Sequence, residues 1–143
     1  MILKANNQEL EINILFSKAR KFQNEFCKDD ETLLTKLPES MVKKDGIDTL
    51  IDVLHFFQTS ETKMSKDDIG NFLDFYFSEN EKDMYDLYTE VLKEFDVSGI
   101  FKRGMGFKMA TTMMKKMEEV IKNMDKVMEE KTVQEAQSEQ IQE

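Results

Sequence analysis

The chain begins with a short stretch in which apolar and polar residues alternate. After Asn6 and Asn7, apolar residues occupy every second position, which is the period of a β-strand: Leu10, Ile12, Ile14 and Phe16. A shorter apolar segment precedes the two asparagines, and asparagine tolerates the positive φ of a tight two-residue turn. The pattern therefore predicts an N-terminal two-stranded β-hairpin in which Lys4 faces Glu9. A lone hairpin is only marginally stable in water, so we expect it to pack on helices or to pair with another strand.

Downstream, the spacing of the apolar residues changes to that of helices with one buried face. Ser17 is expected to cap a first short helix, and Asp45 to open a second. The inner face of the second helix would be formed by Ile47, Leu50, Ile51, Leu54 and Phe57. Residues 28–40 are expected to be a connector between them, because Pro38 breaks helical hydrogen bonding.

Two further helices are predicted before residue 101. Ser65 and Asp68 resemble a capping box at the start of the third. Asn80 is expected to cap the fourth, and Gly99 to end it. The apolar stripe of that fourth helix would be Met84, Leu87, Tyr88, Val91, Leu92 and Phe95. We therefore predict a mainly α (α+β) protein in which residues 1–101 form the hairpin plus a bundle of about four helices.

A methionine-rich segment follows, residues 102–131, and it predicts one long amphipathic helix. Seven of the 11 methionines of the chain lie between Met105 and Met128. A seam with coiled-coil-like spacing runs along it, formed by Ala110, Met113, Met117, Val120, Met124 and Val127, and widened by Met114, Ile121 and Met128. The opposite face carries Lys115, Lys116, Glu118, Glu119, Lys122 and Lys126. Such a helix must bury its apolar stripe against something.

Two interpretations of this stripe stay open. Methionine fills gaps in cores, so the stripe can pack against the other helices or against another copy of the chain. Methionine also specifies shape weakly and adapts to many partners, so the stripe can be a binding surface for another protein. The candidate binding residues are Met105, Met109, Met113, Met114, Met117, Val120, Ile121, Met124 and Met128. Gly99, Gly104 and Gly106 precede the stripe and make the helix a candidate movable arm.

Composition and charge narrow the possible partners. The chain has 143 residues, which suits one domain, and residues 132–143 are so polar that we expect a disordered tail. The net charge is −9, which disfavours nucleic acid and anionic membranes as partners. The most apolar stretch, residues 50–57, is far shorter than the ~20 residues of a membrane helix. The N-terminus lacks the pattern of a signal peptide, so a cytoplasmic protein is expected.

The chain has few residues of the types that form catalytic and metal sites. Cys27 is the only cysteine and His55 the only histidine, too few for a typical zinc site. A Cys–His nucleophile pair would need these two side chains within hydrogen-bond reach and a third group to orient them. The acidic clusters lack the spacing of a calcium loop, and the glycines near residue 104 lack that of a phosphate-binding loop. We therefore expect no enzyme, no cofactor and no metal.

The order of elements resembles a family, the tail assembly chaperones of long-tailed bacteriophages that infect Gram-positive hosts. The resemblance covers roughly residues 1–101. It rests on the N-terminal strand–turn–strand–helix "MILKANNQELEINILFSKARKFQNEF", the apolar helix "GIDTLIDVLHFF", the capped acidic helix "SKDDIGNFLDFY" and the amphipathic helix "DLYTEVLKEFDVSGIF". These are patterns of apolar and capping residues rather than a catalytic signature. The methionine-rich helix and the polar tail lie outside it.

The resemblance implies a function in tail assembly. Such proteins bind the aggregation-prone tape measure protein in the host cytoplasm, keep it soluble, help recruit tail tube subunits, and are absent from the mature virion. In many phages a ribosomal frameshift adds a C-terminal extension, which would begin near "EAQSEQIQE". The alternative is a small acidic helical phage or prophage protein, structural or regulatory, that forms a homo-oligomer through its methionine-rich helix.

Overall fold

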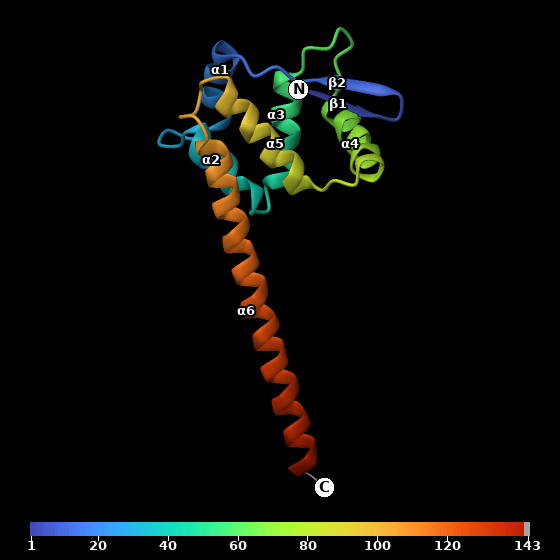
Figure 1. Cartoon of the computed structure of the whole chain (residues 1–143), viewed down its shortest axis with the longest axis vertical. Helices are drawn as coiled ribbons and strands as arrows, with labels where there is room; N and C mark the ends of the chain where they lie inside the picture. The colour runs from blue at the N-terminus through green and yellow to red at the C-terminus, as the bar shows by residue number, and fades with distance from the viewer. Residues whose placement is uncertain (142–143) are drawn as a thin grey trace.

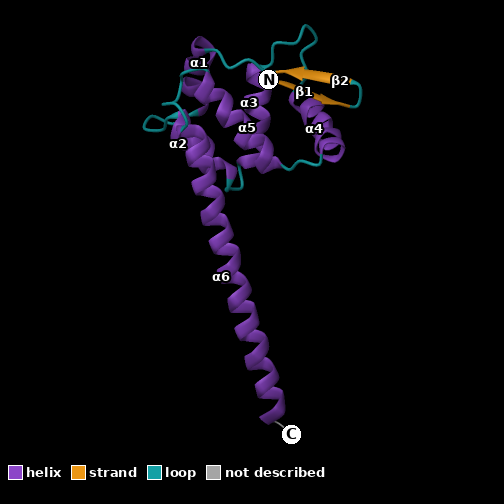
Figure 2. Ribbon diagram, in the orientation of Figure 1, coloured by secondary structure: helices purple, strands orange, loops and turns teal. Residues whose placement is uncertain are grey.

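The computed structural model describes the backbone of residues 1–141 and the side chains of residues 1–134. A hairpin of β1 (Ile2–Ala5) and β2 (Gln8–Glu11) opens the chain. The helices that follow are α1 (Phe16–Phe26), α2 (Leu33–Met41), α3 (Gly46–Phe57), α4 (Lys66–Asn80), α5 (Met84–Val97) and α6 (Met105–Ile141). The predicted fold class, mainly α with an N-terminal hairpin and a long C-terminal helix, is confirmed (Figure 2).

The hairpin has the predicted register. Lys4 pairs with Glu9, and the turn residues Asn6 and Asn7 adopt φ values of 51° and 57°. The hairpin is joined to the helical body, because the N–H of Asn13 donates to the carbonyl of Phe57 at 3.1 Å. Leu10, whose side chain is fully buried, adds an apolar contact to this hydrogen bond. The body thus supplies the support that a lone hairpin lacks.

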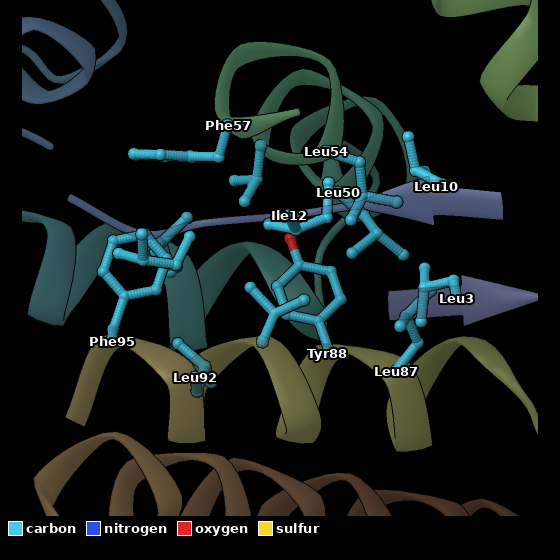
Figure 3. Close-up of a cluster of buried hydrophobic side chains, with 14 of the residues drawn as sticks. Leu3, Leu10, Ile12, Leu50, Leu54, Phe57, Leu87, Tyr88, Leu92 and Phe95 are labelled. Atoms are coloured by element: carbon cyan, nitrogen blue, oxygen red, sulfur yellow. The ribbon is translucent and has the colours of Figure 1, made fainter. Parts of the chain in front are cut away.

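The core lies between the hairpin, α3 and α5. Figure 3 shows Leu87, Tyr88, Leu92 and Phe95 pointing from one side of α5 toward Leu50, Leu54 and Phe57 of α3 and toward Leu3, Leu10 and Ile12 of the hairpin segment. Phe57 and Phe95 meet edge to face with ring centroids 5.5 Å apart, a favoured geometry for aromatic pairs. The hydroxyl of Tyr88 donates to the carbonyl of Gly46 at 3.2 Å, so the one polar group of this cluster is paired.

The expected connector around Pro38 is wrong, because α2 forms there. Thr32 and Thr35 make a capping box at its start, and Pro38 lies inside the helix. A proline inside a helix costs about 3 kcal/mol or more. Burial of a large apolar side chain gains about 1.5–3 kcal/mol, and α2 buries three of them at helical spacing: Leu33, Leu37 and Met41. The burial therefore offsets the cost of the proline.

The predicted helix boundaries hold at some caps and fail at others. The Ser65–Asp68 capping box is confirmed, with the N–H of Asp68 donating to Ser65 Oγ at 3.1 Å. Ser17 is not the N-cap, because α1 begins at Phe16 and its N-cap residue is Leu15. Asn80 ends α4 instead of capping α5, because Glu81 takes the left-handed conformation with φ of 53°.

The starts of α3 and α5 differ in how they are capped. The helix α5 is capped by Asp83, whose side chain accepts from the N–H of Asp86. Asp45 precedes α3 as predicted, although its side chain makes no capping hydrogen bond. Ile47 was expected on the inner face of α3 and is instead 61% exposed.

The expected disordered tail from residue 132 is wrong as far as Ile141, because α6 continues through it. The segment has no glycine or proline, and its Glu, Gln and Ala are good helix formers. Its low apolar content leads to a polar helix rather than to the absence of one. Residues 142–143 of the predicted tail lie outside the described residues.

Candidate protein-binding surface on α6

The helix α6 leaves the body and projects away from it (Figure 1). Its first part, which we call the root (residues 105–117), packs against α5 and α2. Ala110 is fully buried there, and Met113 and Met114 pack against the core. The remainder of α6 stands clear of the body.

The root is attached through Asp96 of α5. The carboxylate of Asp96 accepts hydrogen bonds from the N–H of Gly106 at 2.8 Å and from the N–H of Phe107 at 3.2 Å. Both amides belong to the first turn of α6, where no intrahelical acceptor is present and where negative charge is favourable. Asp96 is only 8% exposed, so these bonds are shielded from water. A residue of one helix thus caps the next.

Gly106 makes this attachment possible. A Cβ atom at this position would lie 2.6 Å from the carbonyl oxygen of Leu92 and 2.9 Å from Oδ1 of Asp96. Only glycine therefore lets α6 approach the α5 backbone this closely. Phe101, in the connection before α6, is 5% exposed and stacks on Phe95 with ring centroids 5.2 Å apart. The predicted movable arm is thus anchored at its base, and Gly106 is a contact rather than a hinge.

The nine predicted binding residues fall into two groups. Those of the root are half-buried: Met105, Met109, Met113, Met114 and Met117. The others are exposed to solvent: Val120 56%, Ile121 50%, Met124 62% and Met128 68%. Val127, which belongs to the predicted seam but was not among the nine, is 51% exposed and joins them. We call these five exposed residues, Val120, Ile121, Met124, Val127 and Met128, the bare stripe.

The bare stripe continues the face by which the root packs on the body. From Ala110 to Met128 the apolar residues keep a spacing of three or four, so they follow one side of the helix. The body covers the first half of this face and leaves the second half in solvent. Val120 to Met128 spans about 12 Å at the helical rise of about 1.5 Å per residue. Beyond it the face is polar, beginning with Lys131.

An exposed apolar strip rimmed by charge is typical of a protein interaction site. The residues on the other side of α6 are exposed and charged, among them Glu119, Lys122 and Lys126. Contiguous apolar side chains on a helix surface fit a second apolar helix, whose anchors would recur at the same spacing. The arrangement can therefore cover an apolar stripe on another protein.

The remaining candidates for chemistry, Cys27 and His55, lie in the body. Burial raises the pKa of the Cys27 thiol, which lowers the population of the reactive thiolate at neutral pH. His55 is half-buried in the last turn of α3. Within residues 1–134, no group of three or more His, Cys, Asp or Glu side chains is placed to hold a metal ion. Of the helices that the structure describes, none has the length and apolar character to cross a bilayer.

Comparison with protein-family models, with characterised proteins and with solved structures found no match for this chain.

Proposed function

We propose that the chain is a bacteriophage tail assembly chaperone that binds the tape measure protein through the bare stripe of α6. The observation that carries this proposal is the bare stripe itself. Five large apolar side chains stand in solvent on a helix whose root is anchored to a folded body. A surface of this kind is already formed before a partner binds.

The composition of the stripe suits an elongated helical client. Tape measure proteins resemble long helices with exposed apolar stripes, and an apolar helix offers many overlapping binding sites along its length. Methionine has an unbranched, polarisable side chain that adapts to different neighbours at low strain. Met124 and Met128 lie one helical turn apart, and they would let one chaperone bind at several positions along such a client.

The rest of the molecule supports solubility of the complex. The chain carries a net charge of −9, and charged residues cover the side of α6 opposite the stripe. A complex in which the stripe of α6 covers the apolar side of a client helix would therefore present charge to the solvent. The proposal includes no enzymatic activity and no cofactor. It places the protein in the host cytoplasm, where recruitment of tail tube subunits follows client binding.

Self-association is the second candidate, and the seam spacing favours it. Residues 110–127 follow the alternation of three and four that two helices of a coiled coil share. In that case the chain is a structural or regulatory phage protein. Size-exclusion chromatography with light scattering separates the two functions. A stable dimer that becomes a monomer when the chain is ended after Met117, which keeps the root, supports self-association. If the full chain and the shortened chain are both monomers, the result favours client binding.

Client binding is tested with two matched triple variants of α6. The stripe variant replaces Ile121, Met124 and Met128 with serine, and the control replaces Glu119, Lys122 and Lys126 with serine. Both change three exposed residues of the same turns, so their effects on the helix are similar. Each is co-expressed with an aggregation-prone tape measure fragment from the same genome. We expect the stripe variant to lose most of the soluble fragment and the control to retain it. Equal solubility with both variants would refute the proposal.

A further inference from the structure

An apolar hollow lies between α3 and α4, away from α6. It is a groove of about 410 Å³. Its walls are formed by Ile47, Leu50, Ile51, Leu73, Phe77 and Met84. Figure 1 shows α4 on the opposite side of the body from the root of α6, with α3 and α5 between them. The groove is therefore separate from the bare stripe, and this inference does not depend on the function proposed for α6.

Gly70 opens the floor of the groove. It lies in the interior of α4, where glycine is about 0.5–1 kcal/mol less favourable than alanine. A Cβ atom at Gly70 would meet nothing within 4 Å. This contrasts with Gly106, whose missing side chain lets two helices of the chain meet. The fold of the described residues makes no use of the space above Gly70, and that space is what a side chain from another molecule would fill.

The side chains that line the groove are apolar except that of Asp74. Ile47, one of the apolar lining residues, is 61% exposed. Asp74 lines the groove and is exposed to solvent. The helices α3 and α4 together carry one lysine and six aspartates and glutamates. That lysine, Lys66, pairs with Asp52 at 2.8 Å. Asp74 is the one charged residue of the groove lining, so the charge in the lining is negative.

We infer that this groove binds an amphipathic helix with a basic flank from a partner protein. Apolar side chains of the partner would enter the groove over Gly70, where the two backbones can come close. A basic flank would face Asp74, and this charge complementarity would set the orientation and the rate of binding more than the affinity. The groove thus gives the chain a second point of contact, for a partner opposite in charge to the body.

The binding test uses variants that leave the bare stripe out. In the chain with serine at positions 121, 124 and 128, Gly70→Leu fills the groove, whereas Asn71→Leu adds the same side chain next to it, outside the groove lining. The probe is a fluorescent leucine/lysine amphipathic peptide of about five helical turns, followed by anisotropy. We expect Gly70→Leu to raise the Kd at least about tenfold, and Asn71→Leu to leave it within about twofold. Equal affinity of both variants would overturn the inference.

A charge reversal keeps the test decisive if Gly70→Leu does not fold. Asp74 is exposed, so Asp74→Lys is tolerated by the fold. It should weaken binding of the leucine/lysine peptide and strengthen that of a leucine/glutamate peptide of the same pattern. A leucine/glutamate peptide that already binds the Asp74 protein as tightly would contradict the basic flank. Binding only by a peptide of residues 105–128 would also contradict it, because the occupant would then be a second copy of the chain.

Discussion

Tyr88 shows how one polar atom is accommodated among the large side chains of the core. It is 2% exposed, and its hydroxyl donates to the carbonyl of Gly46. Burial, with a smaller contribution from the charge of Asp45, raises the pKa of Tyr88 well above its usual value. Folding therefore keeps the proton on this hydroxyl under conditions in which the unfolded chain has released it.

The pKa shift predicts how stability depends on pH in alkaline solution. The contribution of Tyr88 is complete below the pKa of an unfolded tyrosine, about 10, and is lost as pH rises above it. We expect the free energy of unfolding, measured by urea denaturation at each pH, to fall above this value. In Tyr88→Phe the fall should be smaller, while stability at neutral pH decreases by about 1 kcal/mol through the lost hydrogen bond. Tyr85→Phe is the control, and an unchanged slope in Tyr88→Phe would show that Tyr88 is not the group responsible.

Sequence reasoning succeeded at single residues where the signal is local. The turn at Asn6 and Asn7 and the capping box of Ser65 and Asp68 depend on neighbours within three residues. It failed to identify Asp96, which caps a helix that begins nine residues further on. The local sequence around Asp96 does not indicate this contact, because the hydrogen bonds form only after α5 and α6 have packed together.

Among the elements, α6 has an apolar face that is partly buried in the body and partly exposed to solvent. Its root is core and its bare stripe is surface, yet both have the same spacing of apolar residues. The pattern could predict the helix and its inner face, because these follow from periodicity. It could not predict how much of that face the body covers, because coverage depends on where α5 and α2 end. The helix α2 was itself missed, since a proline signal outweighed the helical spacing of its buried residues.

The attachment of α6 can be tested with two glycine-to-alanine substitutions. At Gly70, with open space around it, alanine should raise the free energy of unfolding by about 0.4–1 kcal/mol through lower entropy of the unfolded chain. At Gly106, with the Leu92 carbonyl in the way, the same substitution should lower it by about 1–3 kcal/mol. Chemical denaturation measures both. Stabilisation by Gly106→Ala would mean that the root does not pack on α5 as described.

Across the molecule, a folded acidic body presents one long helix to the solvent. The resemblance predicted from the sequence covers residues 1–101, whereas the surface proposed to bind the client lies beyond residue 101. The sequence predicted an apolar stripe along the methionine-rich helix. The structure adds that only the bare stripe, Val120 to Met128, is exposed to solvent. The groove at Gly70 was not visible in the sequence, because its walls come from two helices and from Met84 at the start of a third.

The methyl groups of the methionines report on the proposed binding surface. Met124 and Met128 are 62% and 68% exposed, whereas Met41 is 1% exposed in the core and serves as an internal reference. With methionine methyls labelled by ¹³C, a soluble tape measure fragment is titrated into the protein and the NMR signals are followed. The proposed function predicts that the signals of Met124 and Met128 shift or broaden as the fragment binds, while that of Met41 stays unchanged. Binding of the fragment with both stripe signals unchanged would contradict it.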